Sequence, residues 1–122
     1  MARIFLDANY FIDLLEKRRD IDLSLFEGKT LLLSPLTAHI AHYVLKARVP
    51  SEKINAYLDF FSYVPLEAKI ATSSQLGPQP DFEDNLQLHS AAAAECDIFL
   101  TQDRELLKLK FFGKTRIVAK LS

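Results

Sequence analysis

The chain has 122 residues, of which 49% are hydrophobic and 25% charged, enough for one domain with its own core. The formal net charge of −1 excludes a protein that binds nucleic acid mainly by counterion release. The single cysteine, Cys96, excludes a disulfide scaffold and is expected to be a buried thiol. No apolar run reaches the length of a membrane span and no signal peptide is recognisable, so we expect a cytoplasmic protein without a membrane partner.

Short apolar runs alternate with helical patterns in the first half of the chain. Arg3–Leu6 predicts a strand ending at Asp7, and Asn9 suits the N-cap of a helix over residues 10–17. The expected elements that follow are a buried strand over Thr30–Leu33, a helix from Ser34 and Pro35 to about Arg48, a helix from Ser51, and an edge strand over residues 63–66.

The second half continues the alternation and ends on a strand. A helix over residues 67–76 is followed by a helix that starts at Asp81 or Phe82 and ends near Cys96. The last elements are a strand over Ile98–Leu100, a short helix from Asp103 to Leu109, and a strand over residues 115–119. With no linker or repeat, this pattern predicts a single α/β domain over residues 1–122, with a mostly parallel sheet of four to five strands.

Charge is segregated near the C-terminus. Residues 81–103 hold six acids and no Lys or Arg, a local charge of −6, whereas residues 104–122 hold six bases against one acid, a local charge of +5. One interpretation is two solvated faces. The other is a carboxylate cluster that binds divalent cations beside a basic lip that binds a polyanion. The lip residues would be Lys108, Lys110, Lys114 and Arg116, while the intervening Phe111 and Phe112 favour core packing over stacking on bases.

Three acids are expected to meet at one edge of the sheet. Asp7 and Asp103 follow predicted strands, and Asp84 lies early in a helix that returns antiparallel to those strands. Each residue alone is also typical of a cap or a turn. Together, however, such carboxylates repel one another unless a cation neutralises them, and all-oxygen ligation favours Mg²⁺ or Mn²⁺.

Four segments then resemble motifs of one family. They read IFLDANYFIDLL at residues 4–15, LSPLT at 33–37, DFEDNLQ at 81–87 and FLTQDREL at 99–106. In order and spacing the chain resembles the PIN-domain family of metal-dependent ribonucleases, which includes VapC-type toxins. The resemblance implies a three-layer α/β/α fold and Mg²⁺- or Mn²⁺-dependent hydrolysis of RNA phosphodiester bonds. It also implies an antitoxin protein as a partner, and leaves open whether the chain forms a homodimer.

The resemblance assigns roles residue by residue. Asp7, Asp84 and Asp103 correspond to the family's acidic metal ligands, Thr101 to its hydroxyl residue beside the metal, and Asn9 to its small polar residue at the start of the first helix.

One motif departs from the family pattern. The family's second motif reads Ser-x-x-Thr-x-x-Glu, and here Ser34 and Thr37 are followed by Ile40 where the Glu should stand. The neighbouring His39 either turns toward the site, where it would favour Mn²⁺, or stays on the helix surface. The missing carboxylate leaves a second interpretation open, a degenerate PIN-like domain that binds RNA or a protein partner without cleavage.

Two other α/β families with an Asp after the first strand fit less well. A response-regulator receiver needs a mid-chain phosphoacceptor, and the only candidate, Asp59, lies in a predicted helix. A haloacid-dehalogenase-type phosphatase needs a second Asp two residues after the first, where this chain has Asn9.

Overall fold

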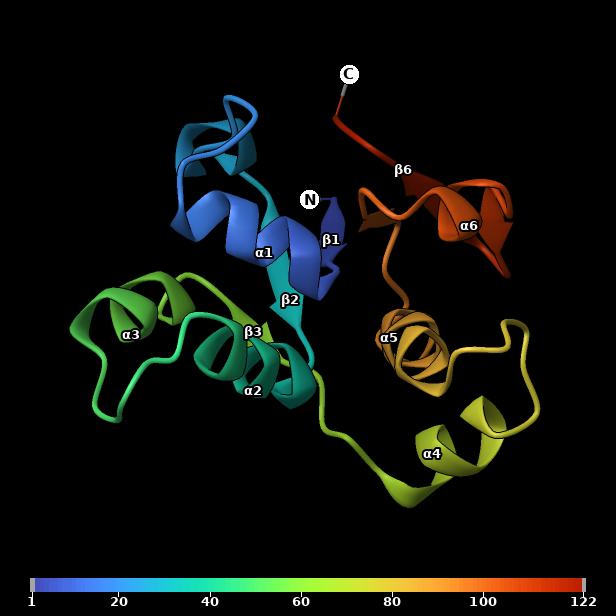
Figure 1. The fold of residues 1–122 in the computed structure, drawn as a ribbon. Coiled ribbons are helices and arrows are strands. Elements are labelled where there is room, and N and C mark those ends of the chain that lie inside the picture. The colour runs from blue at the N-terminus through green and yellow to red at the C-terminus, as the bar shows by residue number, and fades with distance from the viewer. Residues whose placement is uncertain (1, 122) are drawn as a thin grey trace.

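A six-stranded sheet runs through the centre of the protein, whose computed structural model describes residues 2–121 (Figure 1). The strands lie in the order β3-β2-β1-β4-β6-β5. Every neighbouring pair is parallel except β5 and β6, which form an antiparallel hairpin at one edge. The strands are β1 (Arg3–Leu6), β2 (Thr30–Leu33), β3 (Ser62–Tyr63), β4 (Ile98–Leu100), β5 (Phe111–Phe112) and β6 (Thr115–Val118).

Helices cover both faces of the sheet, as Figure 1 shows. On one side lie α1 (Ala8–Leu15), the 3-10 helix η1 (Leu23–Phe26), α2 (Pro35–Val44) and α3 (Glu52–Leu58). On the other side lie α4 (Ala68–Ser74), α5 (Phe82–Ala93) and α6 (Arg104–Leu107).

Alternation along the strands builds two cores. In β1, Ile4 and Leu6 join the core under α1, whereas Phe5 joins the core under α5, where its ring stacks on Phe99 at 5.5 Å between centroids. Successive side chains of a strand point to opposite faces, so a strand covered on both sides is apolar throughout. This explains why the strands read as continuous apolar runs, and it confirms the three-layer α/β/α class.

Parallel pairing brings the ends of β1, β4 and β6 to one edge. Leu6 pairs with Leu100, and Leu100 pairs with Val118. The helices that follow β1, β2 and β4 begin at this edge, and α5 returns with its first turn there. The edge therefore collects the N-terminal ends of several helices, as expected for ligand sites in open parallel sheets.

Several boundaries differ from the expected ones. The N-cap of α1 is Asp7, not Asn9. The helices expected to reach Lys17, Arg48 and Cys96, which are α1, α2 and α5, end earlier, at Leu15, Val44 and Ala93. After each end a residue other than glycine takes a positive φ, namely Lys17, Lys46 and Glu95 at 54°, 53° and 54°. Because Gly usually holds this conformation at helix ends, the sequence carries no stop signal there.

Three smaller differences concern the short elements. The edge strand expected over residues 63–66 is Ser62–Tyr63, so Pro65 lies outside it. The short helix after Asp103 stops at Leu107 rather than Leu109. Phe111–Phe112 adds a strand that the sequence did not predict. Within residues 2–121, no helix is long and apolar enough to cross a membrane.

Candidate functional site

Asp7 lies at the junction of β1 and α1 and is 6% exposed. Its Oδ1 accepts the amide hydrogen of Ala8 at 2.9 Å and caps α1, while its Oδ2 accepts the hydroxyl hydrogen of Thr101 at 2.7 Å. Its own amide donates to the carbonyl of Leu100 at 2.9 Å, which ties the junction to β4. Burial raises the pKa of Asp7, although these hydrogen bonds oppose the rise.

Thr101 links Asp7 to Asp103. The Thr101 hydroxyl is fully buried and also accepts the amide hydrogen of Asp103 at 3.0 Å. Asp103 in turn caps α6, where its Oδ1 accepts from the amides of Glu105 at 2.8 Å and Leu106 at 3.3 Å. Its Oδ2 takes no part in the cap, so one carboxylate oxygen is left for another role.

Asp84 comes from the first turn of α5. The carboxylate of Asp81 caps this helix and accepts the Asp84 amide hydrogen at 3.0 Å. Partial burial, followed by the charges of Asp81, Asp7, Asp103 and Glu83, raises the pKa of Asp84 to about 7. The carboxylates of Asp7 and Asp103 are thus close enough for their charges to disfavour the ionisation of Asp84.

Gln87 connects this group to α2 and was missed by the sequence analysis. It is 1% exposed, and its Nε2 donates to the Thr37 hydroxyl at 2.7 Å and to Asp7 Oδ1 at 3.4 Å. Its Oε1 is buried without a hydrogen-bond partner among the described residues. The signal was present, because residue i+3 of a helix lies on the same face as Asp84.

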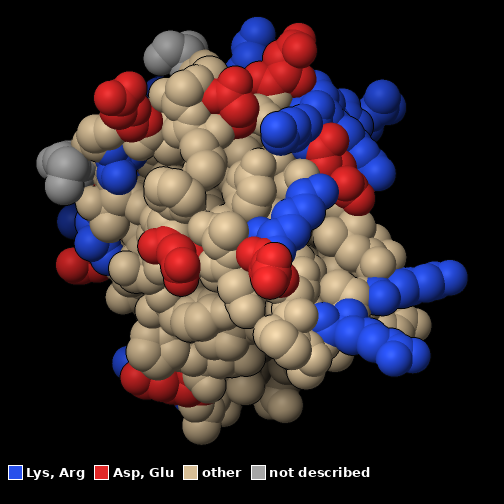
Figure 2. Space-filling model, turned by 90° about the vertical axis from the view of Figure 1, so that its left-hand side faces the viewer, with Lys and Arg blue, Asp and Glu red and all other residues tan. Residues whose placement is uncertain are grey.

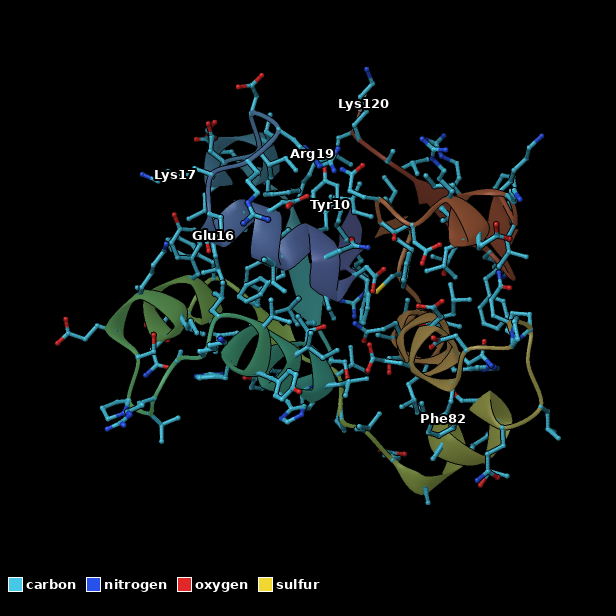
Figure 3. The ribbon with its side chains drawn as sticks, in the orientation of Figure 1. Tyr10, Glu16, Lys17, Arg19, Phe82 and Lys120 are labelled. Carbon is cyan, nitrogen blue, oxygen red and sulfur yellow. The ribbon has the colours of Figure 1, made fainter. Side chains whose placement is uncertain are left out.

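Side chains also occupy the space between α1 and α5, near the acids. Figure 3 shows side chains filling the space between the start of α1, near Tyr10, and α5. Phe82, the first residue of α5, projects on the side of α4 and is 47% exposed. Of the three acids, Asp7 is buried, whereas Asp84 and Asp103 are half-buried.

Among the expected site-lining residues, Ser34 and Asn9 hold local structure. Ser34 is fully buried, and its hydroxyl caps α2 by accepting the Leu36 amide hydrogen at 3.1 Å. Asn9 Oδ1 accepts the Gln102 amide hydrogen at 3.3 Å, so it braces the loop that carries Thr101 and Asp103.

His39 does not turn toward the acids. It is exposed, and its ring stacks near Tyr43 with centroids 6.3 Å apart. Two residues along a helix rotate a side chain by about 200°, so His39 points away from Thr37, the α2 residue that reaches Gln87. Ile40, which replaces the expected Glu, packs against the core under α1.

The expected basic lip does not form one rim beside the acids. Lys108 pairs with Glu105 at 3.0 Å on the exposed face of α6. Arg116 pairs with Ile98 at the start of β4, and Lys114 precedes β6. Because β6 is parallel to β4, both residues lie toward the N-terminal ends of these strands, whereas the acids lie at the C-terminal ends. The sequence placed them beside Asp103 by proximity in the chain alone.

The residues fit a hydrated divalent cation better than a directly bound one. Within residues 2–121, no three His, Cys, Asp or Glu side chains are placed to coordinate one ion directly. The donors at this edge are nevertheless all oxygens, their negative charges are uncompensated, and Gln87 Oε1 has no partner. Mg²⁺ suits such a site because it keeps several waters and uses one or two carboxylates.

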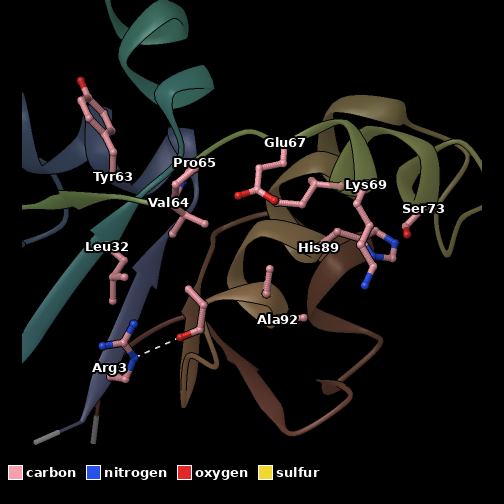
Figure 4. Close-up of a pocket in the computed structure, with 13 residues that line it drawn as sticks. Arg3, Leu32, Tyr63, Val64, Pro65, Glu67, Lys69, Ser73, His89 and Ala92 are labelled. Atoms are coloured by element: carbon pink, nitrogen blue, oxygen red, sulfur yellow. Dashed lines mark hydrogen bonds between the residues drawn. The ribbon is translucent and has the colours of Figure 1, made fainter.

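A cavity with a volume of 640 Å³ lies elsewhere. It is bordered by Arg3, Leu32, Tyr63, Lys69 and His89, among others (Figure 4). Its α5 residues come from the C-terminal half of that helix, whereas Asp84 comes from the first turn. None of the expected site residues lines it.

The other buried groups have structural roles. His89 Nε2 lies 2.9 Å from the Gly77 carbonyl oxygen, and its ring meets Phe112 edge-on. Cys96 is a buried free thiol, as expected, and burial raises its pKa to about 11, which disfavours the reactive thiolate.

Comparison with known proteins supports the fold. No protein-family model and no curated protein matches the sequence. Among solved structures, the chain is similar to a chain in the crystal structure of VapBC2 from Rickettsia felis bound to a DNA fragment from their promoter. The match has a TM-score of 0.68 and 16% identity, and it covers 95% of this chain and 97% of the other. At this identity, the similarity establishes a shared fold.

Proposed function

We propose that this protein is a divalent-cation-dependent endoribonuclease of the VapC toxin type, with an antitoxin protein as its partner. The observation that carries the proposal is the placement of Asp7, Asp84 and Asp103 around one sheet edge, with the pKa of Asp84 raised to about 7 by burial and by its acidic neighbours. Such mutual repulsion is a cost that a bound cation removes. The shared fold with VapBC2 is consistent with it.

In this proposal Asp7, Asp84 and Asp103 hold a hydrated Mg²⁺ or Mn²⁺ ion. When bound, a divalent cation lowers the pKa of a coordinated water and offsets charge on a phosphate. Thr101 orients Asp7 by donating to Oδ2, and it positions Asp103 by accepting its amide hydrogen. Gln87 fixes the other Asp7 oxygen from α5. These neutral contacts hold the carboxylates in place without neutralising their charge.

A second function is favoured by one observation. Ile40 stands where the resemblance expects a Glu, and it packs into the core, so α2 contributes no carboxylate. The alternative is a degenerate PIN-like domain that binds RNA or a protein partner without cleaving RNA. The two proposals differ in one outcome: a divalent metal leads to cleavage of bound RNA in the first and leaves it intact in the second.

A cleavage assay separates the two. End-labelled single-stranded RNA is incubated with protein and Mg²⁺, Mn²⁺ or chelator, and the products are resolved on a denaturing gel. We expect metal-dependent cleavage that Asp103→Asn abolishes, because Asn still caps α6 but carries no charge. The matched control is Glu105→Gln, which removes an exposed acid two residues away and should cleave like the wild type. RNA retention without cleavage under every metal condition would establish the degenerate domain instead.

A further inference from the structure

The hairpin of β5 and β6 forms an edge of the sheet and presents an aromatic ring beside a guanidinium. Phe111 pairs directly with Arg116 across the hairpin, and Phe112 pairs with Thr115. Residues directly opposite in an antiparallel pair have side chains on the same face, with Cβ atoms about 5 Å apart. Phe111 and Arg116 therefore lie side by side.

The two phenylalanines face opposite ways. The Phe112 ring is packed edge-on against His89 of α5, with centroids 4.8 Å apart, and belongs to the core on that side. Phe111, its neighbour in the strand, consequently points to the other face and is 57% exposed. The packing of Phe112 fixes the strand and so holds Phe111 in an outward orientation.

Three basic residues belong to the same hairpin segment as the exposed ring. Lys110, Lys114 and Arg116 are all exposed, and none forms an ion pair with another described residue. Asp97 lies close to Arg116, because its carbonyl accepts the Arg116 amide hydrogen at 3.0 Å, while its carboxylate accepts the Arg3 amide hydrogen at 2.8 Å. The three basic side chains of the hairpin are therefore left without an acidic partner among the described residues.

Another face of the molecule serves as a comparison. Figure 2 shows the side that carries η1 and α3, where acidic side chains lie among and beside the basic ones. An exposed aromatic is present in this part of the chain as well, Phe60 at 60%. Exposure of a ring alone therefore does not distinguish the hairpin, whereas a ring between unpaired cations does.

We propose that the hairpin over residues 110–116 binds single-stranded RNA, with Phe111 stacked on a base and Lys110, Lys114 and Arg116 on the flanking phosphates. An aromatic platform with cations beside it suits single strands, because stacking accepts any unpaired base and cations follow the backbone. The choice of RNA rests on the proposed function, but binding at the hairpin does not require the cation site.

The hairpin holds RNA away from the carboxylates. Arg116 lies two residues before Val118, about 7 Å back along β6 from the edge where Thr101 and Asp103 begin. The hairpin is also displaced sideways across the sheet from β1, which carries Asp7. It therefore binds a segment of the strand beyond the bond to be cut.

The test measures the affinity of the full-length protein for a fluorescein-labelled single-stranded RNA by fluorescence anisotropy, with chelator present to prevent cleavage. Phe111→Ala should weaken binding about 5- to 100-fold without changing its salt dependence. Arg116→Gln and Lys114→Gln should each flatten the dependence of log affinity on log salt by about 0.7. All three side chains are exposed, and thermal unfolding confirms that each variant is folded.

Matched controls lie at the other end of the sheet. Phe60→Ala removes an equally exposed ring, and Lys29→Gln removes an exposed cation just before β2, and both should bind RNA like the wild type. An RNA duplex of the same length should bind more weakly, and Phe111→Ala should not change its affinity. Equal losses in control and hairpin variants would overturn the proposal, as would displacement of the RNA by polyglutamate of equal charge.

The two proposals fail separately. If the hairpin variants bind like the wild type while Mg²⁺ or Mn²⁺ still supports cleavage, the hairpin proposal is wrong and the nuclease proposal stands. If binding depends on Phe111 and Arg116 but no metal supports cleavage, the nuclease proposal is wrong and the hairpin proposal stands.

Discussion

The two ends of α1 each hold a buried aspartate, and their surroundings differ. Asp13, 7% exposed, is met by the guanidinium of Arg19 at 3.1 Å and of Arg18 at 4.0 Å. Asp7, 6% exposed, receives only neutral hydrogen bonds, and further carboxylates lie nearby. The sequence after α1 supplies the cations that neutralise Asp13, whereas no Lys, Arg or His within residues 2–121 forms an ion pair with Asp7.

This difference separates a structural carboxylate from a candidate ligand. A buried charge is costly unless it is paired, and Asp13 meets that condition within the chain. Asp7, Asp84 and Asp103 form no ion pair with another described residue, and in the proposal a cation from solution neutralises them. The comparison therefore predicts opposite consequences for changes at the two ends of the helix.

The largest expected difference is in RNA cleavage. Asp7→Asn keeps the size of the side chain and an oxygen for the Ala8 amide but removes the charge, so cleavage should fall on the order of 100-fold or more. Asp13→Asn should cleave at the wild-type rate, because its carboxylate lies at the far end of α1. The readout is the initial rate of product formation in Mg²⁺ or Mn²⁺. Equal losses in the two variants would remove the distinction between the two ends.

The next largest effect is expected from a change at Gln87, whose side chain holds Asp7 in place. Gln87→Met removes the donor to Asp7 and Thr37 and leaves the buried Thr37 hydroxyl without its partner. We expect a loss of about 1–3 kcal/mol in the free energy of unfolding, measured by urea denaturation. A matched change at the exposed Gln75→Met should cost little. A wild-type free energy of unfolding in Gln87→Met would contradict the structural role assigned to this amide.

The pH dependence of stability tests the environment of Asp84, the α5 carboxylate near Asp7. With its pKa raised from 3.8 to about 7, folded Asp84 binds a proton that the unfolded chain releases. Its contribution to stability is fully present below pH 3.8 and is lost as pH rises through 7. In chelator at pH 8, Asp84→Asn should therefore be more stable than the wild type by about 1 kcal/mol, allowing for solvent screening.

Thermal unfolding at two pH values checks this sign. The advantage of Asp84→Asn should shrink at pH 5, where the wild-type carboxyl is largely protonated. An Asp84→Asn variant that is less stable than the wild type at pH 8 would show that its charge is already compensated.

The smallest expected effect concerns the end of α1 where Asp13 forms ion pairs. Arg19→Gln removes the closer partner of Asp13, and because Arg19 is 63% exposed the loss should stay below about 1 kcal/mol. The loss should shrink as salt increases, since exposed charges are screened. Thermal unfolding at low and high salt measures it, with Arg48→Gln on the loop after α2 as the control. A larger, salt-independent loss would mean that Asp13 depends on this pair as a buried charge does.

The convergence of the acids could be predicted from the sequence because it depends on topology. Asp7 and Asp103 directly follow apolar strands, and parallel pairing brings such residues to one edge whatever the exact register. Asp84 follows from the same logic, since a returning helix begins where the strands end. These three placements needed no knowledge of side-chain contacts.

What could not be predicted depends on contacts between distant segments or on local conformation. The cap of α1 falls on Asp7 because β1 ends immediately before it, although Asn9 suits a cap equally well by residue type. The contact of Gln87 with Thr37 joins two helices 50 residues apart. The strand β5 is two residues long, follows Lys110 with φ at 64°, and has no sequence signature.

The basic residues illustrate the same limit. Sequence proximity to Asp103 placed Lys114 and Arg116 beside the acids, but the chain reverses in the hairpin and carries both toward the other edge. The turn between β5 and β6 moves these two charges by about the length of a strand. Only the pairing of β6 with β4 shows at which end of the sheet they lie.

Calorimetric titration of the protein with Mn²⁺ tests the central claim most directly, because it measures the cation site without RNA. The wild type and Asp13→Asn should bind Mn²⁺ with the same heat and affinity, whereas Asp84→Asn should lose most of both. Binding should also weaken as pH falls below 7, where the Asp84 carboxyl gains a proton. Equal titrations of all three proteins, or no heat in the wild type at pH 8, would contradict a shared cation site at Asp7, Asp84 and Asp103.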